Sequence, residues 1–540
     1  MKKEKQALTR EQIHGFSKKL LEDMVYALLM QVDDMNEKMD TLIEMITVLK
    51  NEKYGRSTEE LNELEKKLGN CFNESEMTVD QADPKELTEP DIAEINPPSA
   101  PEGKKPKKGT RESMIRKLPC RDDIYEIPED DRVCSCGGKL REIGEDTVTT
   151  LEFHPATFEV VTQHIKKYVC DDCGSFMTAD HPANLFEGSL ATPSLLSGIA
   201  TGKFVNALTY YRLESMFADS GAFIQRPTMA RWMIKTAEEY FSLMYYRLKE
   251  ELLSCDVIHA DETTVEVNKD GRKAGSKSYM WVYTKEGNEK PVVLYEYQKT
   301  RKAQHPKEFL QDYKGWLCCD GYEGYHSLSE NITVCGCWVH AKRHYANAVK
   351  ALSKKHDRVT ELTVSGEALR LIGEIFHLDK SWKDLSFEER LYKRQTELKP
   401  KIDAYFEWVE SKIGTVPPKS ETGKGLNYSL TQKKYLLGAL SNPDAPLDNS
   451  QAERSICNFV ISRKNFVLID TLTGADASAI MFSMSETAKA NGLKPYNYFE
   501  YLLTELPKHM KENSKDMSFL DELLPWSKTL PESIRKEIKQ

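Results

Sequence analysis

The stretch that decides the fold runs from Cys255 to Val267 and reads Cys-Asp-Val-Ile-His-Ala-Asp-Glu-Thr-Thr-Val-Glu-Val, with Asp261 at its centre. Its apolar and β-branched residues are typical of a strand within a sheet. Two further strands are predicted at 278–284 and 291–297, because the polar connection that begins at Lys285 is short enough for antiparallel neighbours. The sequence therefore predicts a three-stranded meander that begins with the Asp261 strand.

A fourth predicted strand begins at Gly315 and ends in Asp320 and a glycine turn, and a fifth, at 332–339, precedes a helix. Three antiparallel strands followed by two more, each leading to a helix, indicate an α/β ribonuclease-H-like fold. Strands one and four are neighbours in that arrangement. Asp261 and Asp320 should then face each other near the sheet edge, close enough to repel unless a metal ion lies between them.

A third carboxylate is expected from Glu453, which lies near the start of a predicted helix that opens with Asp448-Asn-Ser-Gln-Ala. Three carboxylates suffice for phosphodiester chemistry, because two Mg²⁺ ions about 3.5–4 Å apart can activate an attacking oxygen and stabilise the leaving oxygen. Mg²⁺ prefers such hard oxygen ligands. We therefore predict that Asp261, Asp320 and Glu453 are catalytic and bind Mg²⁺ or Mn²⁺.

Each of these residues also has a purely structural interpretation. Asp261 could cap the turn after a strand, and Asp320 could form an Asp-Gly turn. Glu453 could close a capping box with Ser450, in which a Glu at the third helical position bonds back to the Ser450 amide. Arg454, Arg463 and Lys464 could neutralise DNA phosphates beside the metal ions, or could form a solvated helix face.

The N-terminal region carries a heptad between residues 18 and 50. Its apolar positions predict a two-stranded parallel coiled coil and self-association, although one amphipathic helix packed on its own protein would look similar. From 70 to 118 the chain is acidic, then proline-rich and then basic, which is typical of a linker. The heptad positions are Leu21, Leu28, Met35, Leu42 and Leu49, with Val25, Val32, Met39 and Ile46 between them.

Two cysteine pairs separated by short β-rich stretches predict a small zinc ribbon. The ligands would be Cys134, Cys136, Cys170 and Cys173. The second pair is an ordinary CxxC knuckle followed by Gly, whereas the first is a CxC turn that is one residue short. The alternative interpretation is four thiols in a small β-unit without metal.

Residues 192–240 are predicted to be helical, with a break at Ser220-Gly221 and a new start at Arg226-Pro227. This is a helix-turn-helix-like arrangement. Arg231 and Lys235 lie four residues apart on its last helix and are candidate DNA contacts, although surface arginines are common on any helix pair.

The composition, with 40% hydrophobic and 30% charged residues, is that of a globular protein of several domains. The formal net charge of −10 argues against a uniformly basic surface, so DNA binding would depend on local Lys and Arg clusters. No apolar run approaches the roughly 20 residues that span a bilayer, and no apolar signal core follows Met1. We expect a cytoplasmic protein whose twelve cysteines are thiols or metal ligands.

Ordered motifs along the whole chain resemble those of the IS-sixty-six family of bacterial insertion-sequence transposases, which belongs to the DDE group. The motifs are Tyr54-Gly-Arg56-Ser, Cys136-Gly-Gly, Ile143-Gly-Glu-Asp146, Tyr211-Arg212, Arg226–Trp232, His259-Ala-Asp261-Glu-Thr, Cys319-Asp320-Gly-Tyr, Cys337-Trp-Val-His340-Ala-Lys-Arg343, Asn449-Ser-Gln-Ala-Glu453-Arg-Ser-Ile, Ile461-Ser-Arg463-Lys464-Asn465, Glu486-Thr-Ala-Lys-Ala-Asn-Gly492 and Pro495-Tyr496.

The resemblance implies that Asp261, Asp320 and Glu453 are the catalytic triad and that a helical insertion precedes Glu453. It also adds Arg343 to the candidate DNA contacts and makes small accessory proteins of the same element plausible partners. The shortened first cysteine knuckle departs from the family, where the thiols are usually spaced wider.

The implied function is metal-dependent cleavage at transposon ends followed by strand transfer into target DNA. A structure-selective nuclease without strand transfer and a coiled-coil zinc-ribbon DNA-binding regulator are the alternatives. We expect a coiled-coil region at 1–69, a linker at 70–118, a zinc-ribbon-like domain at 119–182, a helix-turn-helix-like DNA-binding region at 183–250, a catalytic domain from 251–345 and 441–490, a helical insertion at 346–440 and a C-terminal tail region at 491–540.

Overall fold

The computed structural model describes residues 189–536 apart from 274, 286–289, 353–362 and 512–515, together with 19, 25, 158, 167–169, 176–178 and 185–186. The predicted linker and all four predicted zinc ligands lie outside the described residues, as does the heptad apart from Val25. Strands β1 (Lys167–Val169) and β2 (Phe176–Thr178) form an antiparallel hairpin. Cys170 and Cys173 fall between these two strands in the sequence.

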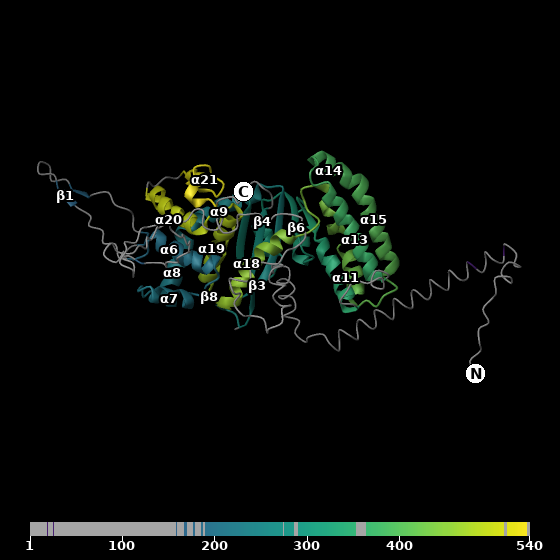
Figure 1. Ribbon diagram of the computed structural model, residues 1–540, viewed down its shortest axis with the longest axis horizontal. Helices are drawn as coiled ribbons and strands as arrows, with labels where there is room; N and C mark the ends of the chain where they lie inside the picture. Colours follow the sequence, from purple (N-terminus) through teal and green to yellow (C-terminus); the bar gives the residue numbers. More distant parts are fainter. Residues whose placement is uncertain are drawn as a thin grey trace, which may run out of the picture. The chain divides into compact units, whose positions relative to one another are not determined.

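A mixed sheet with the strand order β5-β4-β3-β6-β7 forms the centre of the described chain (Figure 1). β3, β4 and β5 are antiparallel neighbours, whereas β6 and β7 run parallel to β3. All five strands predicted from the sequence are therefore present. A short strand that was not predicted, β8, pairs in parallel with the far end of β3. The bounds are β3 (Val257–Lys269), β4 (Lys277–Lys285), β5 (Val292–Gln298), β6 (Gly315–Cys319), β7 (Ile332–Gly336) and β8 (Ile469–Thr471).

Helix α19 (Leu472–Ala490) covers the outer edge of β5 with hydroxyl side chains. The Ser483 hydroxyl accepts a hydrogen bond from the Tyr295 amide at 2.7 Å. The Thr487 hydroxyl accepts from the Val293 amide at 3.0 Å and donates to the Val293 carbonyl at 2.9 Å. An uncovered edge strand is a template for pairing with other chains, and these contacts satisfy part of its backbone.

Helices before the sheet pack with α19 and α20 in one hydrophobic core with β3, β4 and β5. The predicted break is present, since α7 ends at Asp219 and α8 begins at Arg226 with Pro227 in its first turn. A second interruption, at 206–209, was not predicted, and Ala207 there has a positive φ of 57°. The segments are α6 (Pro193–Ala200), η3 (Thr201–Val205), α7 (Tyr210–Asp219), α8 (Arg226–Thr236), η4 (Ala237–Phe241) and α9 (Ser242–Leu253).

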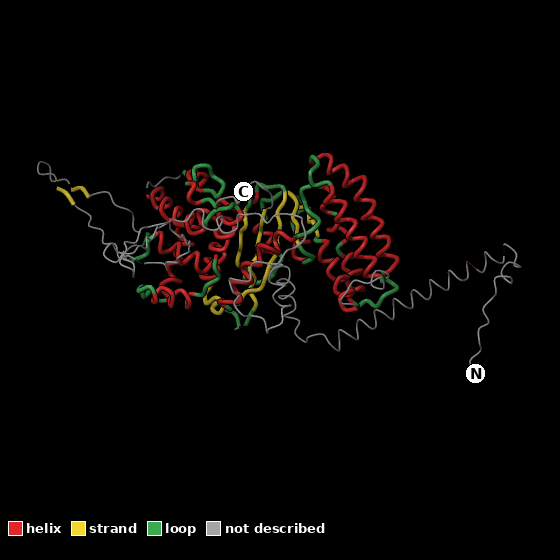
Figure 2. The backbone as a smooth tube through the Cα atoms, in the orientation of Figure 1, coloured by secondary structure: helices red, strands yellow, loops and turns green. Residues whose placement is uncertain are grey.

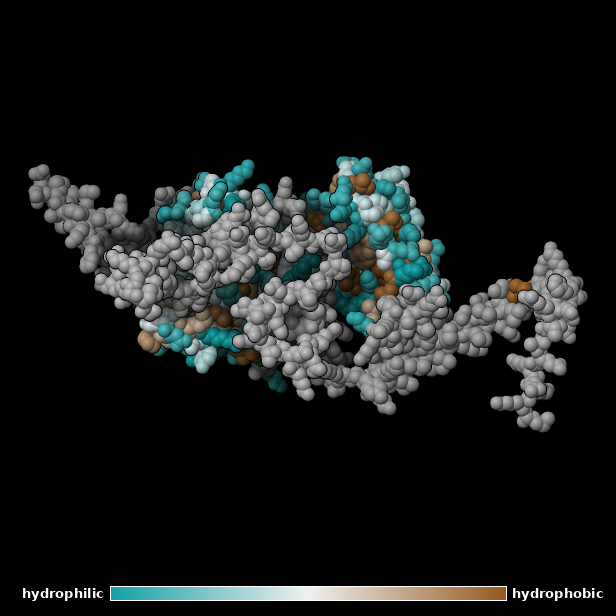
Figure 3. Space-filling view, in the orientation of Figure 1, coloured by the Kyte–Doolittle hydropathy of each residue, from teal (hydrophilic) through white to brown (hydrophobic). Residues whose placement is uncertain are grey.

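A second hydrophobic core joins α11 (Trp338–Leu352), which follows β7, to a group of helices inserted before Glu453 (Figure 2). Trp338 and Tyr345 of α11 are fully buried against these helices. The surface of the bundle in Figure 3 is mainly hydrophilic with scattered hydrophobic patches. The segments are α13 (Val364–Ser381), α14 (Phe387–Lys393), η6 (Arg394–Leu398), α15 (Lys399–Lys412), α16 (Glu421–Thr431), α17 (Lys433–Leu436) and η7 (Gly438–Ser441).

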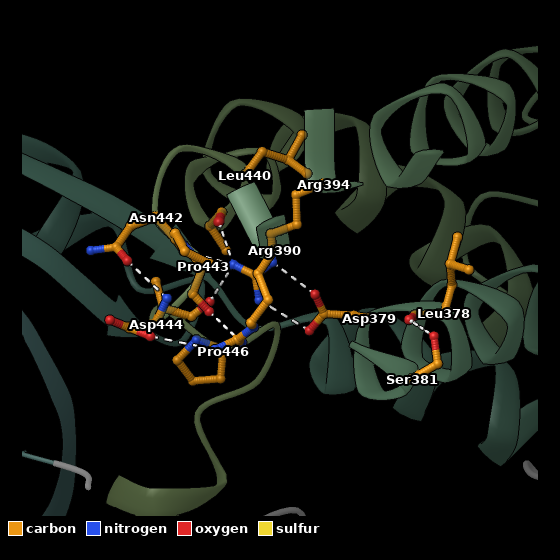
Figure 4. Close-up of polar contacts among 12 residues, drawn as sticks. Leu378, Asp379, Ser381, Arg390, Arg394, Leu440, Asn442, Pro443, Asp444 and Pro446 are labelled. Atoms are coloured by element: carbon orange, nitrogen blue, oxygen red, sulfur yellow. Dashed lines mark hydrogen bonds and ion pairs between the residues drawn. The ribbon is translucent and has the colours of Figure 1, made fainter. Parts of the chain in front are cut away.

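Arg394, whose side chain is fully buried, fastens the chain where it leaves the inserted helices (Figure 4). Its guanidinium donates to the Asp379 carboxylate at 2.7 and 3.0 Å, and its Nη1 donates to the carbonyls of Ala439, Asn442 and Ala445 at 2.6–2.8 Å. A buried arginine is tolerated when its charge is paired and its donors are used. This contact holds the segment that leads directly to Asp448.

The remaining elements are α10 (Gln304–Phe309) and η5 (Glu323–Ser327) within the sheet region, α18 (Ser450–Phe466) after the insertion, and α20 (Pro495–Lys511), α21 (Phe519–Leu523) and η8 (Glu532–Ile534) towards the C-terminus. Within the described residues, no helix is both long enough and apolar enough to cross a membrane.

Candidate active site

Asp261 and Asp320 lie at the same level on adjacent parallel strands. His259 of β3 pairs with Cys318 of β6, so two residues further on Asp261 is level with Asp320, just past the end of β6. Asp261 is 3% exposed, whereas the Asp320 side chain is 22% exposed. Asp320 also makes the predicted turn contact, because its Oδ1 accepts a hydrogen bond from the Tyr322 amide at 2.9 Å. The turn role and a ligand role are compatible, since a carboxylate has two oxygens.

The third carboxylate beside these two aspartates is Glu262, which the sequence analysis did not single out. Asp261, Glu262 and Asp320 each offer one oxygen, and these oxygens lie within 4.8 Å of one another. Burial, followed by the charges of Asp320 and Asp261, raises the pKa of Glu262 to about 7. Crowded carboxylates of this kind fit a divalent cation, which supplies the positive charge that they lack.

Arg301 supplies a positive charge beside this cluster. Its Nε donates to Glu262 Oε1 at 2.7 Å, and its Nη2 lies 3.9 Å from Asp320 Oδ2. The guanidinium stacks on Tyr322 with a 4.0 Å separation from the ring centroid, and the Tyr325 hydroxyl donates to Glu262 Oε2 at 2.7 Å. Arg301 and Tyr325 therefore fix Glu262 on one side of the aspartates.

Glu453 lies on the first turn of α18 and is outside the three-carboxylate cluster. Its Oε1 is 3.4 Å from Arg343 Nη2 and 3.7 Å from His340 Nε2, both on α11. The capping-box interpretation is wrong, because the N-cap of α18 is Asn449 rather than Ser450 and makes no side-chain cap hydrogen bond. Glu453 thus has no capping role, and its contacts are with two side chains from another helix.

Asn449 attaches the start of α18 to β3 beside Asp261. The Asn449 Nδ2 donates to the Ala260 carbonyl at 2.8 Å, and its Oδ1 lies 3.1 Å from His259 Nδ1. The Asn449 amide also donates to the Cys337 sulfur at 3.3 Å, at the start of α11. The helix that carries Glu453 is therefore held next to the strand that carries Asp261.

The predicted DNA contacts fall into two groups. Arg231 and Lys235 on α8 and Arg454 and Lys464 on α18 are exposed. Arg463, in contrast, lies against β3, where its Nη1 is 3.3 Å from the hydroxyls of both Thr263 and Thr264, and burial lowers its pKa. Arg343 faces Glu453, as described above.

Glu486, the other acidic residue of the C-terminal motifs, is engaged away from this site. Its carboxylate accepts hydrogen bonds from Asn458 at 2.6 Å and from Lys489 at 2.7 Å, and it is 6% exposed. It is not part of the carboxylate cluster.

Glu262, Arg301, Tyr325 and the role of Asn449 were not predicted from the sequence. A signal existed for Glu262, because two adjacent acids in a buried strand are unusual. Strand alternation nevertheless sends neighbouring side chains to opposite faces, which argued against pairing Glu262 with Asp261. Arg301 has no local signal, since its contact with Glu262 depends on how β5 and the following segment fold back.

Comparison with known protein families identifies the family of the chain. Residues 188–477 match the model described as Transposase IS66 family. The chain belongs to this family. Residues 483–526 match the IS66 C-terminal element. The matches support a transposase role and agree with the resemblance seen in the motifs.

Residues 131–174, which include the four predicted zinc ligands, match the zinc-finger binding domain of transposase IS66. This match supports zinc in the N-terminal part of the transposase and DNA as a partner. Three uncharacterized proteins of Sinorhizobium fredii (strain NBRC 101917 / NGR234) are similar. The protein y4qI is 26% identical over 91% of this chain and 89% of its own length, and y4jD is 27% identical over 77% of this chain and 81% of its own length.

Proposed function

We propose that the protein is a DDE-type transposase in which Asp261, Asp320 and Glu453 hold divalent ions, Mg²⁺ or Mn²⁺, at the edge between β3 and β6. The reaction is hydrolysis that frees a 3′-hydroxyl at each transposon end, followed by attack of that hydroxyl on target DNA. The proposal rests on the register of β3 and β6, which places Asp261 and Asp320 side by side. Asn449 attaches the start of α18 next to them through its hydrogen bond to the Ala260 carbonyl.

The strand order supports a ribonuclease-H-like catalytic fold, because three antiparallel strands are followed by two that run parallel to the first. The proposed catalytic domain is built from 251–345 and 441–490, with the helical insertion at 346–440 between them. The helical region at 183–250 would bind DNA, and 491–540 would complete the fold.

When bound, the metal ions would stabilise charge on the attacking and leaving oxygens of an in-line displacement. Asp261 and Asp320 would bind them from the sheet, and Glu453 would turn from Arg343 towards them. The Arg343 guanidinium, which lies 3.4 Å from Glu453 Oε1, would then be available for a DNA phosphate. Glu262, paired with Arg301, would lie beside the aspartates and help to orient them.

The N-terminal part would contribute DNA binding and assembly. Cys134, Cys136, Cys170 and Cys173 would hold zinc, and the heptad at 18–50 would join two copies of the chain. The exposed residues Arg231, Lys235, Arg454 and Lys464 would contact DNA phosphates, and small proteins of the same element would be accessory partners.

The test is a cleavage and joining assay with the full-length protein, Mg²⁺ or Mn²⁺, and labelled DNA that carries the ends of the element. Products with free 3′-hydroxyls, followed by strands joined to a target plasmid, are expected. Cleavage without joining would instead indicate a structure-selective nuclease. DNA binding without either product would indicate a regulator.

A further inference from the structure

A cavity of about 530 Å³ lies where the helices before the sheet meet the end of α18, some distance from the carboxylates. Its walls come from η3, α7, α8, the turn between α18 and β8, and the start of α19, which are neighbouring elements in Figure 1. Phe204, Tyr210, Tyr211 and Phe466 line it. Its volume is in the range of pockets that bind small organic ligands.

Lys203 places a positive charge in the wall of this cavity. No hydrogen bond or ion pair of Lys203 occurs with any residue that the structure describes. Its Nζ lies instead over three aromatic rings that also line the cavity, 4.4 Å from the centroid of Tyr210, 4.8 Å from Phe466 and 5.6 Å from Phe204. Burial lowers the pKa of Lys203 to about 8, so most of the population is still charged at neutral pH. A half-buried cation without an anion is costly, and an incoming anion would offset that cost.

Two further features of the wall favour a negatively charged ligand. The N-terminus of α19 lies at the cavity through Thr471 and Gly474, and a helix N-terminus attracts anions. The acidic residue of the wall, Asp470, is already paired with Lys269 at 2.6 Å, so its charge is offset.

Two residues beside the cavity lining in the sequence have strained backbones, a feature that is often found at binding sites. Ala207 and Val467 both have positive φ values, 57° and 64°, although neither is glycine. The Asn465 side chain donates to the Ala207 carbonyl at 2.9 Å and joins the two strained segments. A β-branched residue such as Val467 rarely adopts this conformation.

We propose that this cavity binds one nucleotide, whose phosphate draws Lys203 Nζ off the rings of Tyr210 and Phe466 and whose base takes its place against these rings. Aromatic rings stack on any base, and the lysine supplies the charge that a phosphate requires. The source of the nucleotide, a DNA strand, rests on the proposed function. Phe466 is 13 residues from Glu453 on α18, which is roughly 20 Å at 1.5 Å per residue, or about six base pairs of B-form DNA.

Binding is tested with metal-free full-length protein and deoxyadenosine monophosphate, by calorimetric titration. One saturable site per chain is expected, with affinity lowered about tenfold or more in Lys203→Gln and in Phe466→Leu. Lys393→Gln is the matched control, because Lys393 also lies over an aromatic ring, Trp382, but belongs to the inserted helices. It should bind the nucleotide like the wild type.

Equal affinity in wild type and Lys203→Gln would overturn the proposal. Inorganic phosphate that competes at the same affinity as the nucleotide, with no effect of Phe466→Leu, would also overturn it in favour of a simple anion site. Lys203→Met should melt at or above the wild-type temperature, because it removes a half-buried charge that pairs with no anion among the described residues. Weak binding by Lys203→Gln together with a normal melting temperature therefore reports on the cavity.

A short single-stranded oligonucleotide that carries 2-aminopurine identifies the source. Competition with deoxyadenosine monophosphate and a fluorescence change that Lys203→Gln removes are expected if the cavity takes a nucleotide of a strand. Binding of the free nucleotide without competition by any strand would overturn the DNA source. The proposed function would stand in that case, because its cleavage assay is a separate measurement.

Discussion

Asp261 and Asp320 are positioned by the sheet, whereas Glu453 is positioned by helix α18. Different interactions hold the sheet strands and the helix in place. The register of β3 and β6 brings the two aspartates level through backbone hydrogen bonds. The Glu453 helix is positioned by side chains, chiefly the contacts of Asn449 with His259 and Ala260, which are about 190 residues away in the sequence. The comparison teaches that the sheet fixes two carboxylates, while the third depends on long-range side-chain contacts.

The electrostatic surroundings differ in the same way. The aspartates lie beside Glu262 among like charges, which a divalent ion would offset. Glu453 is instead accompanied by His340 and Arg343. In the metal-free protein, carboxylates outnumber cations around Asp261 and Asp320, whereas Glu453 already lies beside basic side chains.

The largest expected effect is on the sheet side. Asp261→Asn and Asp320→Asn should each lower DNA cleavage by at least on the order of 100-fold, because an amide keeps the shape but lacks the charge that holds Mg²⁺. Gel assays of cleavage and of DNA binding on the same proteins measure this. Binding should persist, and its loss together with cleavage would assign these residues to folding instead.

Glutamine variants of Glu453, Glu262 and Glu486 test which glutamate is the third metal ligand. Glu453→Gln should also lower cleavage by on the order of 100-fold, whereas Glu262→Gln should lower it by about 10-fold, as expected for a group that only orients ligands. Glu486→Gln is the matched control and should cleave at close to the wild-type rate, because its partners are Asn458 and Lys489. If Glu262→Gln is inactive and Glu453→Gln is active, the third ligand is Glu262.

Arg394→Met tests how strongly the Arg394–Asp379 pair stabilises the inserted helices and the segment after them. Removing one partner of a buried ion pair typically costs about 3–5 kcal/mol, and Asp379 would be left without Arg394. Arg370→Met is the control, since the exposed pair of Arg370 with Glu374 should contribute less than about 1 kcal/mol. The urea concentration at the unfolding midpoint is measured for both variants. Equal midpoints would show that Arg394 does not stabilise the inserted helices more than Arg370 does.

The smallest effect concerns pH. The pKa of Glu262 is raised to about 7 in the folded metal-free protein, above the usual value of 4.5, so the folded state binds more protons than the unfolded state between these values. Stability from this group should therefore fall as the pH rises from about 4.5 to about 7. The melting temperature of the wild type minus that of Glu262→Gln, measured with chelator, should decrease over this range. A flat difference would contradict the raised pKa.

Much of the fold could be read from the sequence, because strands and turns leave local patterns. The β-branched run around Asp261, the glycine turn after Asp320 and Pro227 at the start of α8 each depend on neighbouring residues alone. Order along the chain then predicts which strands are adjacent. That reasoning supplied the five strands of the sheet and the facing aspartates.

Only the tertiary structure decided which side chains surround these carboxylates. Glu262 joins the cluster, although alternation along a strand predicts that neighbouring side chains point to opposite faces. Arg301 reaches Glu262, and Asn449 attaches the start of α18 to β3, because of packing between distant segments. Such contacts leave no periodic or local pattern in the sequence. The sequence therefore determines the strands and helices that carry the carboxylates, and three-dimensional packing determines which side chains contact them.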